Sequence, residues 1–159
     1  MVAKYLIFSI IFILILCLNQ AYGKTIYGKP KVIDGDTLHI GKNKIRLHAI
    51  DAPERKQKCI KKEIEWNCGL ESTKFLRNLI GNHTIYCIAK SKDRYNRYIG
   101  ICYKNNIDLN SQMVISGWAI AYRYYSLDYI KEEKEAKLNK VGIWSGKFEE
   151  PYLFRKKNN

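Results

Sequence analysis

Residues 45–50 alternate in polarity, and this segment constrains the fold more than any other part of the chain. Its apolar side chains stand at every second position, which is the period of a β-strand with one buried face. Pro53 ends the strand, because proline cannot donate a hydrogen bond to a sheet ladder. A second extended segment, residues 37–40, precedes it across a turn at residues 41–44, so we expect a β-hairpin here.

Further extended segments alternate with helical ones along the chain. Runs of β-branched and aromatic residues predict strands over residues 25–33, 84–89 and 98–103. Apolar periodicity and end signals predict helices over residues 70–80, 108–117 and 127–139. Asp108 and Ser126 are the expected caps of the second and third helices, and Asp128 falls in the first turn of the third. This order predicts an α+β, mainly β fold: a small barrel with about three helices.

The first 23 residues have the features of an export signal. Lys4 precedes an apolar run over residues 5–18, and Ala21 and Gly23 supply the small residues of a cleavage site. We therefore expect a signal peptide over residues 1–23, one domain over residues 24–159, and a secreted or periplasmic location. An uncleaved membrane anchor is the alternative, although spanning a bilayer needs about 20 apolar residues.

The charge balance of the chain indicates what kind of molecule it binds. The chain carries 28 Lys and Arg residues against 15 Asp and Glu residues, a formal net charge of +13. Such an excess favours a polyanion, either nucleic acid or anionic lipid. Hydrophobic residues make up 47% of the chain, enough for one packed core, which excludes a disordered polyelectrolyte.

Four cysteines follow the signal segment, and an even number in a small exported domain suggests disulfides. Cys59 and Cys68 flank one short loop, whereas Cys87 and Cys102 lie on two segments expected to be neighbouring strands. We favour pairing within each of these two sets among the three possible connectivities. Reduced, buried thiols in an uncleaved cytosolic protein are the alternative.

Acidic residues gather around the predicted hairpin of this basic chain: Asp34, Asp36, Asp51 and Glu54. A hairpin centred on the Gly41 turn places Asp36 near residues 49–50, at the same end as Asp51. Adjacent strands lie about 4.8 Å apart, so the two carboxylates can share one cation. A hard cation such as Ca²⁺ takes carboxylate, carbonyl and water oxygens, and the Ala52 carbonyl is a further candidate ligand. Taken singly, each acid is more often part of a turn or a strand exit.

Three separated motifs carry a family resemblance: Ile33-Asp34-Gly35-Asp36-Thr37, the segment from Ile45 to Glu54, and Asp93-Arg94-Tyr95-Asn96-Arg97. They follow in the order and rough spacing of the staphylococcal nuclease family. Gly117-Trp118-Ala119 and Gly142-Ile143-Trp144 resemble its later signature. The resemblance covers about residues 28–146, and the Cys59–Cys68 insertion is similar to that of exported bacterial members.

The resemblance implies a Ca²⁺-dependent phosphodiesterase, acting on DNA and RNA, on a five-stranded OB-fold barrel. By position, Asp36, Asp51 and the carbonyl of Ala52 would hold the metal, where many members have Thr at the last position. Arg46, Glu54 and Arg97 match the catalytic residues of the family.

The resemblance also implies a substrate surface. Arg94 and Tyr95 would contact a terminal phosphate, and Tyr125 would stack on a base, while Arg123 stands where the family often has Tyr. Stacking favours unpaired strands, so single-stranded nucleic acid is the expected substrate. We expect a monomer by default, with no obligate protein partner.

Two other classes of function remain open from sequence. An OB-fold module that binds single-stranded nucleic acid without cutting it explains the charge and the tyrosines. A cationic surface-adhering protein that uses Lys61, Lys62 and the C-terminal basic residues explains the charge alone. Only a nuclease accounts for Asp36, Asp51 and Glu54 in register with two arginines.

Overall fold

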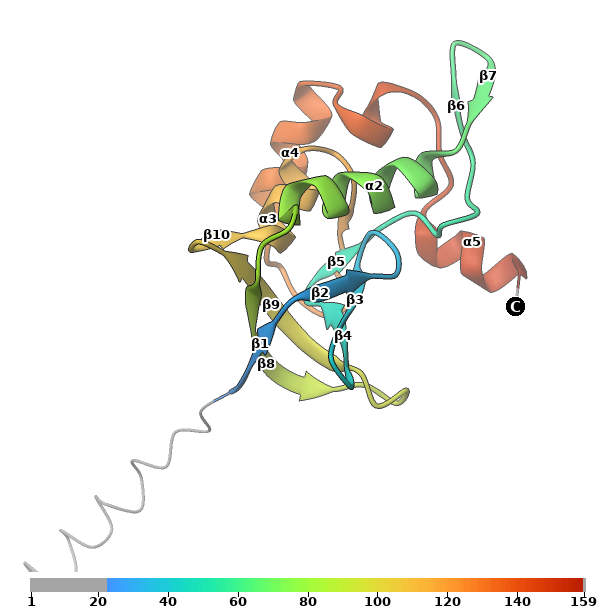
Figure 1. Ribbon diagram of the computed structural model, residues 1–159. Helices are drawn as coiled ribbons and strands as arrows, with labels where there is room; N and C mark the ends of the chain where they lie inside the picture. The colour runs from blue at the N-terminus through green and yellow to red at the C-terminus, as the bar shows by residue number, and fades with distance from the viewer. Residues whose placement is uncertain (1–22, 159) are drawn as a thin grey trace, which may run out of the picture.

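The computed structural model describes residues 23–158, so the expected signal peptide lies, except for Gly23, outside the described residues (Figure 1). The strands are β1 (Lys24–Gly28), β2 (Pro30–Val32), β3 (Thr37–Ile40), β4 (Asn43–Leu47), β5 (Ile50–Asp51), β6 (Cys59–Lys61), β7 (Ile64–Trp66), β8 (Ile85–Lys92), β9 (Tyr98–Lys104), β10 (Ile107–Asp108) and β11 (Ile120–Ala121). The helices are α2 (Cys68–Ile80), α3 (Leu109–Ile115), α4 (Ile130–Leu138), a 3₁₀ turn over Gly142–Ser145, and α5 (Pro151–Asn158).

The main sheet forms a ring. Its strand order is β1-β8-β9-β4-β3-β2, in which β4 and β9 are parallel and the other neighbours antiparallel. β1 and β2 stand at the two ends of this order, yet only Lys29 separates them in sequence. They therefore act as one interrupted strand that pairs with β8 on one side and β3 on the other. The α+β barrel class expected from the sequence is confirmed.

The alternating segment of the sequence supplies the barrel interior. Ile45 and Leu47 of β4 are buried, as are Leu38 and Ile40 of the paired strand β3, while Arg46 between them is only part-buried. Burying an aliphatic side chain contributes roughly 1.5–3 kcal/mol. The period-2 pattern therefore fixes which face of the hairpin carries polar chemistry.

The hairpin is shorter than expected, and its register differs. Ile40 pairs with Asn43 across a two-residue turn, so Asp36 lies opposite Leu47, whose N–H donates to the Asp36 carbonyl at 2.8 Å. The prediction that Asp36 faces residues 49–50 was wrong. The strand ends instead at Leu47, and Ala49 adopts a positive φ of 58° that turns the chain back into β5. This bend, rather than strand pairing, returns Asp51 to the end of the hairpin near Asp36.

The helices partly match their sequence signals. α2 and α3 lie where expected, and the Asp108 side chain accepts the Ser111 N–H at 3.0 Å as the cap of α3. α4 begins at Ile130 rather than at residue 127, because Tyr129 has a left-handed backbone that breaks the helix. Asp128 pairs with His48 at 3.0 Å instead of joining a helical turn.

Two features of the C-terminal part were not expected from the sequence. Helix α5 follows the 3₁₀ turn and lies apart from the other helices, beside the segment after β5 (Figure 1). Gly117 and Gly142, both with positive φ, cross closely, and the Ile143 N–H donates to the Gly117 carbonyl at 2.9 Å. A Cβ at Gly142 would lie 2.2 Å from that oxygen, so glycine is required where the two motifs meet.

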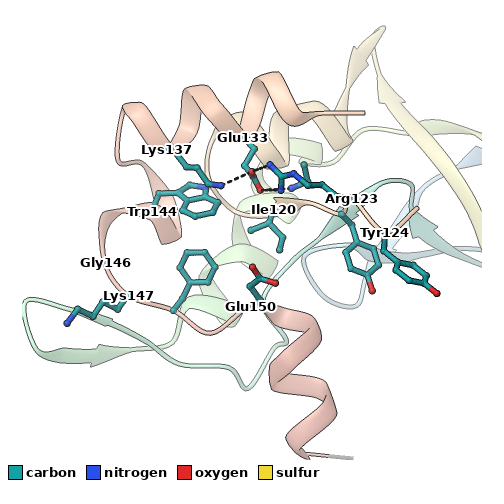
Figure 2. Close-up of a pocket in the computed structure, with 12 residues that line it drawn as sticks. Ile120, Arg123, Tyr124, Glu133, Lys137, Trp144, Gly146, Lys147 and Glu150 are labelled. Carbon is teal, nitrogen blue, oxygen red and sulfur yellow. Dashed lines mark hydrogen bonds and ion pairs between the residues drawn. The ribbon is translucent and has the colours of Figure 1, made fainter. Parts of the chain in front are cut away.

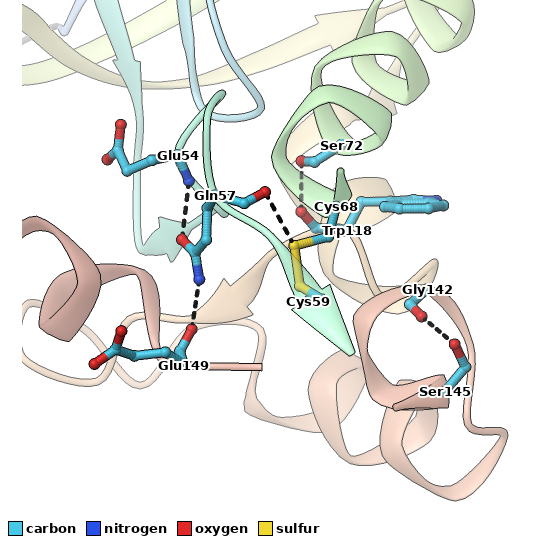
Figure 3. The surroundings of a disulfide bond; sticks show 9 residues. All are labelled: Glu54, Gln57, Cys59, Cys68, Ser72, Trp118, Gly142, Ser145 and Glu149. Atoms are coloured by element: carbon cyan, nitrogen blue, oxygen red, sulfur yellow. Dashed lines mark hydrogen bonds between the residues drawn. A yellow bond between two sulfur atoms is a disulfide. The ribbon is translucent and has the colours of Figure 1, made fainter. Parts of the chain in front are cut away.

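Both disulfides join the cysteines favoured by the sequence. Cys87 and Cys102 are register partners on β8 and β9, and Cys59 and Cys68 close the small β6–β7 hairpin (Figure 3). The second pair anchors the start of α2 beside Gln57, whose carbonyl oxygen lies 3.5 Å from the Cys68 sulfur. Across residues 23–158, no helix combines the length and the apolar character needed to cross a bilayer.

Candidate functional site

Asp36 is the centre of a polar cluster at the open end of the β3–β4 hairpin. Its buried carboxylate accepts the Ala52 N–H at 2.7 Å through Oδ2 and the Thr37 hydroxyl at 3.1 Å through Oδ1. Its own N–H donates to Asp34 Oδ1 at 3.1 Å, which fixes the Asp34-Gly35-Asp36 turn. Gly35 lets this turn approach α2, because a Cβ there would lie 2.1 Å from the Ser72 hydroxyl oxygen.

Arg46 joins Asp36 to Asp51. One terminal nitrogen of its guanidinium donates to Asp36 Oδ1, and the other donates to Asp51 Oδ1 at 2.6 Å. Asp51 is fully buried on β5, which pairs with β11. Asp36, just before β3, and Asp51, on β5, therefore lie at the same end of the hairpin and share one guanidinium, and the backbone bend rather than strand register places them there.

Glu54 lies beside this cluster but does not contact Asp36 or Asp51 directly. Its N–H donates to Gln57 Oε1 at 3.1 Å, and the Gln57 side-chain amide donates to the Glu149 carbonyl at 2.7 Å (Figure 3). A Cβ at Gly69 would overlap the Glu54 carbonyl oxygen, so the start of α2 packs directly on this loop. The loop that carries Glu54 is thus held from both sides.

Arg155 of α5 is a member of the cluster that the sequence reasoning missed. Its guanidinium donates to both Asp51 oxygens, at 2.8 and 3.0 Å, and to Glu54 Oε1 at 2.9 Å. The Arg155-Lys156-Lys157 run reads in sequence as a solvated basic tail, and nothing local distinguishes its first residue. We call the side chains of Asp36, Arg46, Asp51, Glu54 and Arg155 the carboxylate cluster.

Burial and charge act in opposite directions on these acids. Burial raises the pKa of Asp36 to about 6, despite the opposing charge of Arg46. Burial likewise raises the pKa of Asp51, although hydrogen bonds from Arg155 and the charge of Arg46 favour its ionised form. Removing carboxylates from water disfavours their charge, so the cluster needs cationic partners to stay ionised.

The loop between β8 and β9 places Arg94, Tyr95 and Arg97 together. The Asp93 carboxylate accepts the backbone N–H of Tyr95 and of Arg97, both at 2.9 Å, and the Arg97 Nε–H at 2.7 Å. These bonds lower the pKa of Asp93 against the raising effect of burial. Arg94 and Arg97 each lie near the Tyr95 ring, 4.9 and 5.4 Å from its centroid.

Arg97 directly precedes β9 and, within residues 23–158, is not bonded to the carboxylate cluster. β9 runs parallel to β4, and Arg97 comes two positions before Ile99, the register partner of Arg46. Among the described residues its side chain donates only to Asp93, through Nε. Its two terminal nitrogens therefore remain free to bind another acceptor.

Tyr125 belongs to an exposed cluster with Tyr122 and Tyr124. Its ring centroid lies 5.2 Å from that of Tyr122 and 5.0 Å from that of Tyr124, both in edge-to-face geometry. The Tyr122 N–H donates to the Ala49 carbonyl at 2.8 Å, which ties the cluster to the bend before β5. Tyr124 and Tyr125 are 81% and 71% exposed, so their rings are available for stacking.

Arg123 lines a cavity of about 630 Å³ that Tyr122 and Tyr124 also line, and its guanidinium turns toward Glu133 (Figure 2). Its guanidinium donates to the buried Glu133 carboxylate of α4 at 2.5 Å, and Lys137 donates to the same carboxylate at 2.8 Å. Trp144 lines the cavity, with the Lys137 ammonium 4.4 Å from its ring centroid. Arg123 thus binds a carboxylate of α4, and the tyrosine that the family often has at this position is replaced by arginine.

A family profile described as "Staphylococcal nuclease homologue" matches residues 44–146. The chain belongs to the staphylococcal nuclease family. The chain is 34% identical over 122 residues to an "uncharacterized endonuclease" of Haemophilus influenzae, covering 72% of this chain and 64% of the relative. It is 30% identical over 144 residues to a "micrococcal nuclease" of Shigella flexneri, covering 79% and 78%.

Another relative with comparable similarity carries a different kind of name. "Succinoglycan biosynthesis protein ExoI" of Rhizobium meliloti is 32% identical over 123 residues, covering 75% of this chain and 64% of that protein. This chain thus spans about 64% of the length of the first two curated relatives it matches. The matched region contains β4, the Glu54 loop and the β8–β9 loop, whereas α5 and Arg155 lie beyond residue 146.

The oxygen atoms of the site can be compared with the ligands that Ca²⁺, the ion expected from the sequence, prefers. No three His, Cys, Asp or Glu side chains within residues 23–158 form a ready metal-binding group. The cluster instead offers Asp36 and Asp51, whose oxygens already converge on one guanidinium, with Ala52 alongside. This all-oxygen set fits a hard cation that completes its coordination with water and phosphate, rather than a transition metal.

Proposed function

We propose that this protein is an exported, Ca²⁺-dependent nuclease that hydrolyses phosphodiester bonds in DNA and RNA. The observation that carries the proposal is the convergence of Asp36 and Asp51 on Arg46, with Glu54 on the adjoining loop. Asp36, Asp51 and the Ala52 carbonyl would hold the ion. Ca²⁺, when bound, supplies positive charge that polarises a phosphoryl oxygen. The two relatives named as nucleases support the same reaction class.

Each charged residue has a separate task in this proposal. Glu54 accepts a proton from the attacking water or orients it, as the water oxygen bonds to phosphorus and the bond to the leaving sugar oxygen breaks. Arg46 and Arg97 donate to phosphate oxygens as negative charge accumulates in the transition state. The Asp93 hydrogen bond to Arg97 Nε supports this role, because it orients the guanidinium while leaving its terminal nitrogens free.

Substrate binding would extend from the phosphate to the base. Arg94 and Tyr95 contact a terminal phosphate, and the exposed ring of Tyr125 stacks on an unpaired base. The excess of Lys and Arg over Asp and Glu attracts the polyanion, with a strong dependence on salt. The two disulfides are consistent with export to an oxidising compartment, either the periplasm or the medium.

The alternative is a binding module that holds single-stranded nucleic acid without cutting it, and the exposed tyrosine cluster supports it. One assay separates the two. Denatured DNA is incubated with the purified protein in Ca²⁺ and then with a chelator. Cleavage that disappears with the chelator supports the nuclease, whereas binding without cleavage under both conditions supports the module.

Point variants test the assigned roles. Glu54→Gln and Arg97→Ala should each lower kcat at least about 100-fold, the effect of losing one transition-state contact. Glu65→Gln is the matched control, because within residues 23–158 this exposed carboxylate on β7 pairs with Lys58 alone, at 2.9 Å. Near-normal turnover in both test variants would refute these roles.

A further inference from the structure

Arg155 occupies the position that the proposed nuclease needs for its metal and its base. Its guanidinium donates to both oxygens of Asp51, at 2.8 and 3.0 Å, and the same NH1 that binds Asp51 also reaches Glu54 at 2.9 Å. Asp51 is fully buried, and its Oδ1 also accepts from Arg46 at 2.6 Å. Every Asp51 oxygen is therefore engaged by guanidinium, so a cation that binds this carboxylate competes with Arg155 for it.

The helix that carries Arg155 is firmly attached at its start and weakly along its length. The Glu149 carbonyl, two residues before α5, accepts from the buried side chain of Gln57 at 2.7 Å (Figure 3). Within α5 only Pro151 is buried, while Tyr152 and Leu153 are 46% and 44% exposed. Besides Pro151, Phe154 is half-buried and Lys157 pairs with Glu149 at 2.5 Å, so the ion pairs of Arg155 are the attachment that reaches the carboxylate cluster.

The charges of the carboxylate cluster favour the replacement of Arg155 by a divalent ion. Three carboxylates, those of Asp36, Asp51 and Glu54, face only two guanidinium groups in the carboxylate cluster. A divalent ion that replaces Arg155 brings one more positive charge to the same oxygens, and it frees Glu54 at the same time. The guanidinium of Arg155 then returns to water and regains the hydration that a partly buried charge lacks.

From this geometry we propose that α5 is a calcium-displaced latch. Without metal, Arg155 occupies the Asp51 and Glu54 carboxylates and keeps the site inactive. Ca²⁺ binding expels Arg155, and α5 detaches around its anchor at Glu149. The inference rests on the proposed function, because it takes Asp51 as a metal ligand and Glu54 as the base.

A latch lowers the apparent affinity for the ion. The apparent Kd equals the intrinsic Kd divided by the fraction of molecules in which the latch is open. Coupling between two such events lies typically in the range of about 5- to 150-fold. We therefore expect Arg155→Gln to bind Ca²⁺ about 10-fold more tightly than the wild type, and the coupling to be reciprocal, so that Ca²⁺ loosens α5.

Calorimetric titration of the protein with Ca²⁺ alone, without nucleic acid, tests the first expectation. Lys156→Gln is the matched control, because it removes one positive charge from the next, exposed residue and should leave the Kd within about twofold. Arg155→Lys keeps the charge but loses the planar guanidinium that binds both Asp51 oxygens, so its Kd should fall between those of the wild type and Arg155→Gln. This variant also keeps the test usable if Arg155→Gln folds poorly.

Amide hydrogen exchange of α5 tests the second expectation independently of affinity. The Phe154 N–H, which donates to the Glu150 carbonyl at 3.0 Å, should be protected in chelator and exchange faster in Ca²⁺. In Arg155→Gln it should exchange fast under both conditions. Equal Ca²⁺ affinity in all variants, with exchange unaffected by Ca²⁺, would overturn the latch and leave the nuclease proposal standing. Absence of Ca²⁺ binding in every variant would overturn the metal site and the latch together.

Discussion

Glu133 on α4 is the buried charge whose removal has the most predictable effect on stability. Its side chain is 1% exposed and accepts the Ala121 N–H of β11 at 3.1 Å, in addition to the donors of Arg123 and Lys137. β11 pairs with β5, the strand that carries Asp51. Glu133→Ala therefore removes the link between α4 and the strand pair beneath the carboxylate cluster.

The magnitude follows from what the substitution leaves behind. The buried Ala121 N–H loses its partner, which costs about 1–3 kcal/mol. Arg123 and Lys137 are nearly half exposed and can be hydrated, so each lost ion pair adds at most about 1 kcal/mol. We expect a total of about 2–3 kcal/mol, equivalent to a fall in Tm of about 8–12 °C for a domain of this size.

The effect should depend on pH in a defined direction. Burial alone would raise the pKa of Glu133, but hydrogen bonds from Arg123 and Lys137 outweigh it and lower the pKa. A lowered folded-state pKa gives stability that is present above the unfolded value, about 4.3, and is lost as the pH falls through the folded value. The gap in Tm between wild type and Glu133→Ala should thus be wide at neutral pH and should shrink below about pH 4.

Thermal unfolding followed by circular dichroism measures this gap. Glu135→Ala is the matched control, because Glu135 lies on the same helix with an exposed side chain and should change stability by no more than about 0.5 kcal/mol. If Glu133→Ala and Glu135→Ala unfold at the same temperature at pH 7, the buried carboxylate does not stabilise the fold and the reasoning is refuted.

Three further perturbations test other parts of the fold. Gly142→Ala should lower the free energy of unfolding by about 2–4 kcal/mol, because residue 142 has a φ of 55° and the new Cβ would lie 2.2 Å from the Gly117 carbonyl oxygen. An unchanged midpoint of urea unfolding would contradict the close crossing of Gly117 and Gly142. The double variant Cys87→Ser/Cys102→Ser should lose about 3 kcal/mol, since the disulfide closes a loop of sequence separation 15; equal stability of the oxidised wild type and the variant would argue against this cross-link. Asn110→Ala should lower the free energy of unfolding by about 2–4 kcal/mol, because the buried Asn110 amide accepts from the Cys102 N–H at 3.1 Å and donates to the His48 carbonyl at 3.0 Å. Calorimetry should show a lower Tm, and an unchanged Tm would mean that water replaces the amide.

Local signals in the sequence predicted local structure well. The alternation at Ile45 and Leu47 identified the buried face of β4, and Asp108 identified the start of α3. Cysteine pairing followed from strand neighbours, because Cys87 and Cys102 face each other across β8 and β9. These features depend on residues near one another in sequence or on one simple pairing rule.

Features that depend on tertiary partners were not predicted. The predicted hairpin register was wrong because the turn has two residues rather than four, and the bend at Ala49 leaves no sequence pattern that distinguishes it from a continued strand. The start of α4 was placed too early because Tyr129 has a left-handed backbone and Asp128 binds His48 rather than joining the first turn of the helix. Arg155 lies 104 residues from Asp51, so only the folded chain brings it to the candidate site.

The two-residue turn between β3 and β4 has a practical consequence. Gly41 and Lys42 are exposed, and a Cβ at Gly41 would meet no atom within 4 Å. The carboxylate cluster lies at the opposite end of the same hairpin, where its geometry is set by the Asp36–Leu47 contact and the Ala49 bend. The start of β4 adjoins the start of β9, because Ile45 pairs with Tyr98 in parallel, so a fluorophore-bearing peptide grafted at this turn would stand beside the loop that carries Arg97 and would report on events there rather than at the cluster.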